Sequence, residues 1–219
     1  MSIELTEKIR NTHFSKPLRS EEIKYYMENF ALAVLRYCSD EYDNWSACDA
    51  PDLQSSDRTT GIEVTEVAIG MNRAIVGDCL HYWETGDVRY KNKAEQRGAT
   101  AGDMFYILPS FDSNDELSAL ETIFRKKLAK LSLYKKRGFR KIGLIMVMDG
   151  LPIPSTAKYW ADVVRVVQSA SELKYDFVYF TYCSVLSRYD CSAGTVTNTD
   201  LDRSDYDALK KYARCIIEK

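Results

Sequence analysis

Two acidic residues, Asp52 and Glu63, have the surroundings of a metal-binding pair. Asp52 follows Pro51, whose ring fixes its own φ and biases the preceding residue toward an extended backbone. Glu63 lies within the run GIEVTEVAI (residues 61–69), which is rich in β-branched side chains and predicts a strand. If the two segments pair, the carboxylates converge at one edge of a sheet, where two hard oxygen ligands favour Mg²⁺ or Mn²⁺. Such a pair would assist hydrolysis of a phosphodiester bond.

The chain around this pair alternates helices and strands. Glutamates after Ser20 and apolar residues at helical spacing predict a first helix over 20–38, with Ser20 as its N-cap. A second helix is predicted over 115–137 by its acidic start and basic end, and the apolar run 141–148 is typical of a covered central strand. The other predicted elements are short strands at 43–48, 52–56 and 61–69, a helix near 155–170, a strand at 175–186 and a terminal helix at 204–218.

Residues 70–114 do not fit this alternation. The segment RAIVGDCLHYW (73–83) is compatible with a helix or a buried strand, and the polar stretch after it is flanked by glycines. We therefore interpret residues 1–219 as a single α/β domain that carries an insertion at about 70–114.

Pro51-Asp52, a ten-residue gap and Glu63-Val64-Thr65 resemble the motif of the PD-(D/E)XK nuclease superfamily. The order of helix, three strands, helix and strand over roughly residues 20–149 is also similar to the common core of that superfamily. The resemblance implies a restriction-endonuclease-like core, in which a mixed central sheet is flanked by helices. It further implies a Mg²⁺-dependent endo- or exodeoxyribonuclease, with Asp52 and Glu63 as metal ligands and DNA as substrate. RNA stays open as a second substrate.

Thr65 departs from this motif, because it stands where the superfamily has a lysine. Members of the superfamily can carry that lysine on a neighbouring element. On the predicted second helix, Lys127 falls inside the apolar stripe and Lys130 lies on its margin, on a face that also holds Ile123 and Tyr134. An ammonium group there is unfavourable unless carboxylates or a phosphate meet it, or unless it snorkels to water. We interpret Lys127 or Lys130 as the displaced catalytic lysine, which by resemblance orients the attacking water.

The superfamily often adds a glutamate from the first helix, and Glu28 is the candidate for this auxiliary role because it borders the apolar face. Glu22, in the first turn, is the second choice. Carboxylates that share a site without a cation repel one another. We therefore expect that Glu63→Gln leaves the metal-free protein at least as stable as the wild type.

Composition limits the classes of protein that remain. No apolar run reaches the roughly 18 residues that cross a bilayer, and the start lacks a secretion signal, so we expect a cytoplasmic protein without a membrane partner. Six cysteines without a Cys-x-x-Cys pair and two histidines leave few ligands for zinc. The net charge of −2 does not indicate nucleic-acid binding, although the carboxylates of a metal site can offset a local basic patch. A further basic run is interpreted as a solvated helix end rather than a DNA contact: Arg125, Lys126, Lys135, Lys136, Arg137, Arg140 and Lys141.

Two alternatives stay open beside the nuclease. Thr65 is direct support for a catalytically inactive relative that keeps the nuclease fold as a binding or assembly module. The acidic pI of about 5.8 favours a different Mg²⁺ enzyme with a small phosphorylated substrate. Salt-dependent binding to DNA would separate the first two classes from the third. A homodimer is compatible with each of them.

Overall fold

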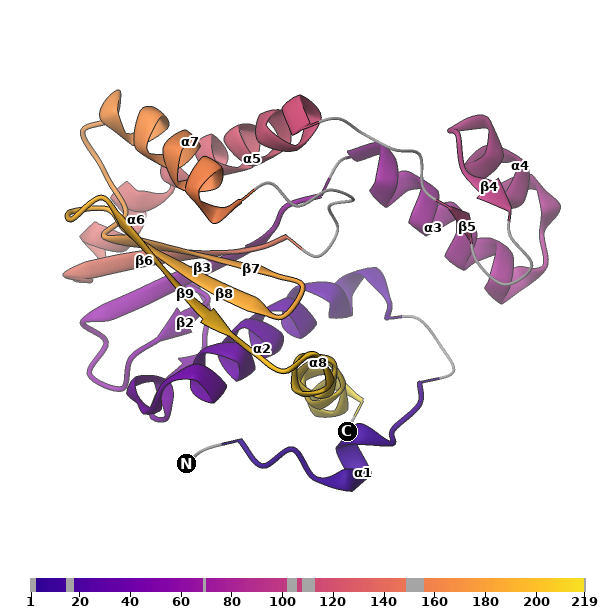
Figure 1. The fold of residues 1–219 in the computed structure, drawn as a ribbon, viewed down its shortest axis with the longest axis horizontal. Helices are drawn as coiled ribbons and strands as arrows, with labels where there is room; N and C mark the ends of the chain where they lie inside the picture. The colour runs from indigo at the N-terminus through magenta and orange to yellow at the C-terminus, as the bar shows by residue number, and fades with distance from the viewer. Residues whose placement is uncertain are drawn as a thin grey trace.

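A seven-stranded mixed sheet forms the centre of the protein (Figure 1). The computed structural model describes residues 3–14, 18–68, 70–101, 106–107, 113–148 and 156–218. The strands follow one another across the sheet as β1 (Ser46–Ala47), β2 (Leu53–Gln54), β3 (Thr60–Glu66), β6 (Lys141–Val147), β7 (Phe177–Tyr182), β8 (Val185–Asp190) and β9 (Thr195–Asp200). Neighbours pair antiparallel except for β3, β6 and β7, which are parallel to one another. The predicted α/β class with a mixed central sheet is therefore confirmed.

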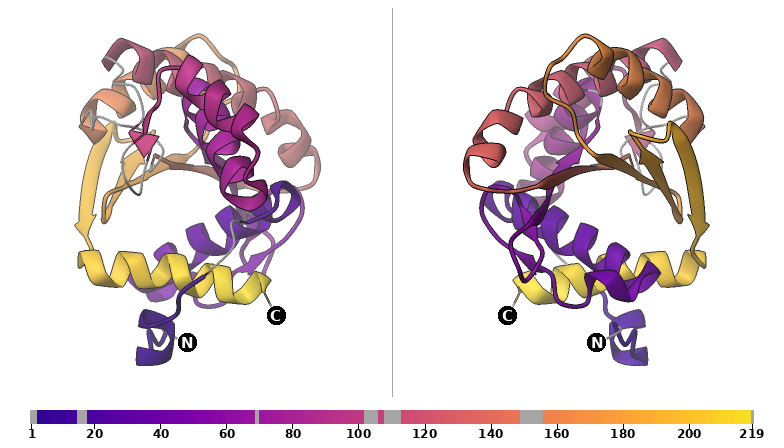
Figure 2. Two further views of the ribbon diagram at one scale, coloured as in Figure 1. Left: turned by 90° about the vertical axis from the view of Figure 1, so that its right-hand side faces the viewer. Right: turned by 90° about the vertical axis from the view of Figure 1, so that its left-hand side faces the viewer.

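Helices cover both faces of this sheet (Figures 1 and 2). One face carries α2 (Ser20–Cys38) and α8 (Arg203–Ile217), and the other carries α5 (Ser113–Leu128), α6 (Leu131–Lys136) and α7 (Ala157–Ser169). In the side views of Figure 2, α8 crosses beneath the sheet and the short helix α1 (Glu7–Arg10) lies beyond it. Among the described residues, no helix combines the length and the apolar character that crossing a membrane requires.

Strand β6 explains the two-layered core. Ile145 and Val147 belong to the cluster of buried side chains beneath α2 and α8. Ile142, Leu144 and Met146 belong to the cluster beneath α5 and α7. Because successive side chains of a strand point to opposite faces, a strand that is covered on both sides must be apolar throughout. This confirms the prediction made from the continuous run at 141–148.

The segment predicted as an insertion begins with two helices, α3 (Gly70–Thr85) and α4 (Val88–Gln96), followed by the paired strands β4 (Thr100–Ala101) and β5 (Tyr106–Ile107). They lie beside the main sheet, on the right in Figure 1. Residues 73–83, which were compatible with helix or strand, belong to α3. A small separate cluster of buried side chains holds this segment together: Ile75, Cys79, Ala94 and Ala99.

The predicted single helix over 115–137 is wrong, because the structure divides it. α5 ends at Leu128, and α6 begins at Leu131 after a tight turn in which the amide of Lys130 donates to the carbonyl of Lys127 at 3.0 Å. The residues on both sides of the turn are good helix formers, so local propensity gave no warning of it. The turn allows side chains from two helices to reach one strand.

The predicted strand at 175–186 is also wrong in extent. It is the hairpin of β7 and β8, and β9 follows as a further strand that was not predicted. Cys183 and Ser184 form the turn with φ of 44° and 69°. Two-residue turns with positive φ usually carry Asn-Gly or Gly, so the usual sequence signal for a hairpin is missing here.

The predicted N-cap of the first helix is wrong by one residue. Arg19 caps α2, and its backbone amide donates to the Glu22 carboxylate at 2.8 Å, so that Ser20 is already within the helix. Helix limits often differ from sequence expectation by this amount.

Candidate active site

Strand pairing brings Asp52 and Glu63 together. Leu53 of β2 stands opposite Ile62 of β3, so the antiparallel register puts Asp52 opposite Glu63. The backbone amide of Val64 donates to Asp52 Oδ2 at 2.8 Å. Both carboxylates are buried, with only 7% and 2% of their residue surfaces exposed. The convergence predicted from the sequence is therefore present.

Gly61 allows this close approach of the two strands. A Cβ atom at Gly61 would lie 2.2 Å from Cγ of Pro51, the residue directly before Asp52. Contacts this short do not occur between real side chains, so any larger residue must displace the loop that carries Asp52. Arg137 holds the same loop from α6, since it donates to the carbonyl oxygens of Ala50 at 2.8 Å and Asp49 at 3.4 Å.

Donors from α5 and α6 surround the Glu63 carboxylate. Lys127 Nζ donates to Glu63 Oε1 at 2.6 Å and to the carbonyl oxygen of Val64 at 3.1 Å. Lys130 Nζ lies 3.2 Å from the same Oε1, and the Tyr134 hydroxyl donates to Oε2. Lys127 is therefore paired rather than snorkelling to water, and it supplies an ammonium group close to the strand position where Thr65 lacks one.

The balance of charge at Glu63 is favourable to its ionised form. Burial alone would raise the pKa of Glu63, but the charge and hydrogen bond of Lys127, with Tyr134 and Lys130, lower it below its usual value. The donors of α5 and α6 therefore oppose the carboxylate repulsion that the sequence predicts, although the charge of Glu63 still raises the pKa of Asp52. The effect of Glu63→Gln on the metal-free protein depends on these two opposing interactions.

Glu28 and Asp52 form the part of the cluster that lacks cations. Burial, followed by the nearby charge of Asp52, raises the pKa of Glu28 to about 7. Burial and the charge of Glu63 also raise the pKa of Asp52, although the hydrogen bond from Val64 opposes this. The two carboxyl groups are close enough for a hydrogen bond between them to affect the pKa of Glu28, so they need a shared proton or a cation.

Lys24 gives this pair only partial compensation. Its ammonium lies 3.5 Å from Glu28 Oε1 and 3.6 Å from the exposed carboxylate of Asp49. Glu28 Oε1 is buried and makes this long ion pair in place of a normal hydrogen bond. A buried carboxylate with one long ion pair is only partly compensated, so the arrangement favours a ligand that brings further positive charge.

The cluster contains all five residues that were predicted for the site: Glu28, Asp52, Glu63, Lys127 and Lys130. Glu22, the second choice for the auxiliary acid, is not among them because its carboxylate binds Arg19 at the start of α2. Lys130 contributes less than Lys127, since about half of its side chain (51%) is exposed whereas that of Lys127 is 18% exposed.

Four further residues at this site had no predicted role. Tyr134 had been located on the same helical face as the lysines, and this was its only signal. Lys24 is four residues before Glu28 on the same helix, so its spacing was a signal that the sequence contained. Arg137 resembles an ordinary surface cation in the sequence, and only the folded chain brings it to the loop. The Tyr175 hydroxyl is buried without a hydrogen-bond partner, and burial, followed by the charge of Glu63, raises its pKa.

The donor set suits a hard divalent cation only in part. No cluster of three or more histidine, cysteine, aspartate or glutamate residues arranged to hold a metal is found in the described part of the chain. The partly compensated Oε1 of Glu28 and the raised pKa values of Glu28 and Asp52 nevertheless fit a divalent cation. The residues that could hold it are Asp52, at the centre, with Glu28 and Glu63 on either side.

Comparison with protein-family models, with curated proteins and with solved structures finds no match to this chain.

Proposed function

We propose that this protein is a Mg²⁺-dependent nuclease that hydrolyses phosphodiester bonds of DNA. The observation that carries the proposal is the ammonium of Lys127, 2.6 Å from Glu63 Oε1, which stands in for the lysine missing at Thr65. A buried lysine held between a carboxylate and a peptide carbonyl is positioned in advance for an anionic group.

The order of elements supports a restriction-endonuclease-like core. α2 precedes the antiparallel strands β1, β2 and β3, and α5 with α6 then crosses over to β6, which is parallel to β3. The two acids lie on β3 and at the start of β2, which is where the PD-(D/E)XK motif has them. On this reading α7, α8 and β7 to β9 extend the core.

Each residue then has a role in hydrolysis. Mg²⁺ or Mn²⁺, held by Asp52 with Glu63 and Glu28, supplies positive charge at the scissile phosphate when it is bound. Lys127 orients the attacking water and stabilises the added negative charge on the phosphate as one P–O bond forms and another breaks. Tyr134 and Lys130 hold the Glu63 carboxylate in place. Because Lys127 binds the same carboxylate, this fixes the position of Lys127 relative to Asp52.

Cleavage of supercoiled DNA tests this proposal directly. We expect the wild type to cut DNA with Mg²⁺ or Mn²⁺ and to be inactive in EDTA. Lys127→Met should lower the rate by about 10²-fold or more, which is the usual cost of losing one such donor. Lys126→Met is the matched control, because Lys126 is the exposed neighbour on the same helix. Equal loss of activity in both variants would contradict the role of Lys127.

A non-catalytic binding module is the second candidate function. It is favoured by a specific observation, namely that donors of the chain itself already occupy both oxygens of Glu63. On this alternative the cluster is a structural ion-pair network. A wild-type protein that binds DNA but cuts none with either metal would select this alternative.

A further inference from the structure

Positive charge is concentrated in one segment of the chain. Residues 125–141 include nine basic residues and no acidic residue, although the net charge of the protein is −2. Four of the nine have partners: Arg125 binds Glu121, Lys127 and Lys130 bind Glu63, and Arg137 binds backbone carbonyl groups. The other five make no ion pair with any residue that the structure describes, namely Lys126, Lys135, Lys136, Arg140 and Lys141.

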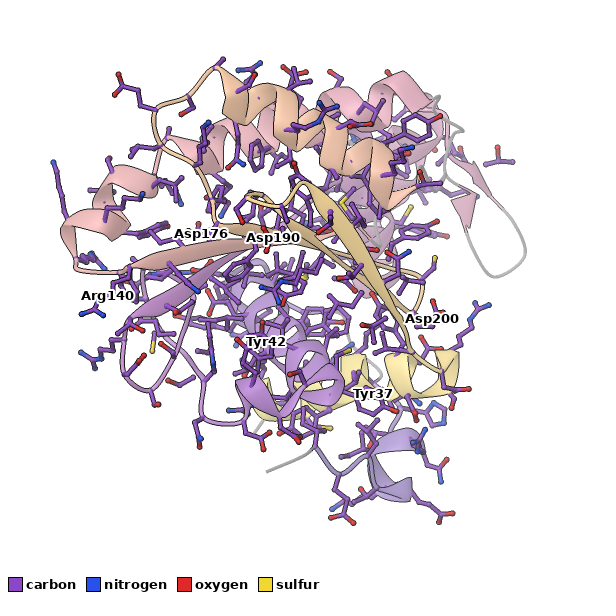
Figure 3. The ribbon with its side chains drawn as sticks, turned by 60° about the vertical axis from the view of Figure 1, so that its left-hand side comes forward. Tyr37, Tyr42, Arg140, Asp176, Asp190 and Asp200 are labelled. Atoms are coloured by element: carbon purple, nitrogen blue, oxygen red, sulfur yellow. The ribbon has the colours of Figure 1, made fainter. Side chains whose placement is uncertain are left out.

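Four of these five cations lie on α6 and at the start of β6, and we refer to Lys135, Lys136, Arg140 and Lys141 as the basic surface. All four are exposed. Figure 3 shows Arg140 at the margin of the molecule, where its side chain projects away from the sheet. Cations without partners lose no ion pair when they bind an anion, so these side chains are free to contact one.

The basic surface begins at the candidate active site. Lys135 directly follows Tyr134, whose hydroxyl donates to Glu63. Lys141 pairs with Thr60 in the register of β3 and β6, three residues before Glu63. At about 3.3 Å per residue, this separates the two positions by about 10 Å along the strand. Because successive side chains alternate, Lys141 points to the opposite face of the sheet from Glu63, so the basic surface lies at the end of the sheet rather than on the face that holds Lys127.

A neighbouring cavity does not extend the basic surface. Its volume is about 460 Å³, and Lys135 and Lys141 line it together with Lys174 and Arg188. Four carboxylates line the same cavity, those of Glu41, Glu172, Asp176 and Asp190. Its charge is therefore mixed, which disfavours a polyanion inside it. The outer side of α6 and the start of β6 carries the unbalanced positive charge.

We infer that the basic surface binds the phosphodiester backbone of the nucleic acid beyond the bond that is cut, an inference that rests on the proposed function. The contacts are to phosphates and carry no base specificity. They release counterions from the nucleic acid, so they should dominate the salt dependence of binding. The acidic overall charge then has a simple explanation, because the basic residues that meet the substrate are offset elsewhere in the chain.

Binding in EDTA tests the inference without any need for cleavage. The probe is a fluorescent DNA duplex of about 20 base pairs, titrated by anisotropy over a range of salt concentrations. The test protein carries Lys136→Gln, Arg140→Gln and Lys141→Gln together. Each lost phosphate contact should lower the slope of log K against log salt by about 0.9, and the triple variant should bind at least about tenfold more weakly.

The matched control removes the same charge from other helices. Lys8→Gln, Lys93→Gln and Lys158→Gln change exposed lysines on α1, α4 and α7. This variant should keep the wild-type slope and affinity. Arg137 is unchanged in both proteins because it holds the loop before Asp52. Thermal unfolding should give equal midpoints for the two triple variants, which separates loss of binding from loss of fold.

Two further probes define the ligand. An RNA duplex of the same sequence shows whether the basic surface binds DNA or RNA more tightly. Anionic lipid vesicles show whether it binds a negatively charged membrane in place of a nucleic acid. On a minimal nitrophenyl phosphodiester the first triple variant should keep the wild-type KM, whereas on a long duplex its KM should rise by about tenfold, since only the duplex reaches the basic surface.

The outcomes separate this inference from the proposed function. Equal slopes in the two triple variants, or tighter binding to vesicles than to either duplex, would overturn the inference even if the wild type cuts DNA. A wild type that binds with the expected slope but cuts nothing would contradict only the nuclease. A wild type that binds neither duplex would overturn both.

Discussion

The two halves of the carboxylate cluster differ in how their negative charge is balanced. At one half, Lys127, Lys130 and Tyr134 surround Glu63, and its pKa is lowered. At the other half, Lys24 lies 3.5 Å from Glu28 and the charges of Lys127 and Lys24 act on Asp52, yet the pKa values of both carboxyl groups are raised. The carboxylates are alike in burial, so burial alone does not produce the difference.

The negative charge is therefore compensated by the chain's own donors in one half of the site, and it is only partly compensated in the other. The donors around Glu63 balance its charge before any cation binds. Glu28 and Asp52 lower the stability of the ligand-free protein when they are ionised, which is typical of groups that are kept for function. Substitutions in the two halves should therefore have effects of opposite sign, and the following predictions test this.

Glu63→Gln should have the largest effect on stability. It removes the charge that balances Lys127, which is largely buried, so we expect a loss of about 2–4 kcal/mol in the free energy of unfolding in EDTA. Urea denaturation measures it. Glu121→Gln on the exposed face of α5 is the control, and it should change stability by less than about 0.5 kcal/mol. A Glu63→Gln protein as stable as the wild type would contradict this prediction. It would support the carboxylate repulsion that was expected from the sequence.

Gly61→Ala should move Asp52 away from Glu63 without changing any charge in the cluster. The new Cβ would clash with Pro51, so we expect a loss of about 1–3 kcal/mol and a displaced Asp52. The control is Gly77→Ala in α3, where a Cβ meets nothing within 4 Å and helix propensity should add about 0.5–1 kcal/mol. Thermal unfolding in EDTA compares them. If both substitutions stabilise the protein, the close contact of Pro51 with Gly61 does not position Asp52.

Glu28→Gln should stabilise the protein, and only at high pH. The pKa of Glu28 is raised from 4.5 to about 7, so the folded protein favours the protonated carboxyl group. The stabilisation by protonated Glu28 is complete below pH 4.5 and is lost as the pH rises through 7. At about pH 8 the variant should be more stable than the wild type by about 1–3 kcal/mol, and at about pH 4.5 the two should agree. Urea midpoints across this range measure the effect.

Glu22→Gln is the control for this pH dependence. Glu22 lies on the same helix, but the hydrogen bonds from Arg19 lower its pKa, so its substitution should reduce stability at high pH. Added Mg²⁺ should stabilise the wild type and the Glu22 variant more than the Glu28 variant. A gain at high pH in both variants would show that the effect is general to the acids of α2.

Lys130→Met should have the smallest effect. Its ammonium is 3.2 Å from Glu63 and its side chain is half exposed, so we expect a loss of about 0.5 kcal/mol and a much smaller decrease in cleavage than for Lys127→Met. Comparing the two variants in one assay ranks the lysines. An equal loss of cleavage in both would mean that the lysines act as a unit around Glu63.

Particular residues show how far the sequence could lead. The alternation around Glu63 and the register implied by Pro51-Asp52 were enough to predict that the carboxylates converge, because strand periodicity is local. The apolar stripe was enough to identify Lys127 as a cation out of place. The break before α6 was not predictable, because strong helix formers stand on both sides of Lys130 and local propensity favours one continuous helix. The turn at Cys183 and Ser184 was missed because it lacks glycine.

The sequence by itself determined the α/β class, the order of the elements that carry the site, and the five residues that meet there. Periodicity and local residue preference are properties of neighbouring positions, so they are readable without a fold. Only the tertiary structure decided how charge is divided within the cluster. The pKa of a carboxyl group depends on burial and on the groups within a few ångströms, and Lys127 and Tyr134 are more than 60 residues from Glu63 in the chain. Their distances to Glu63, and the approach of Asp52 to Glu28, exist only in the folded protein.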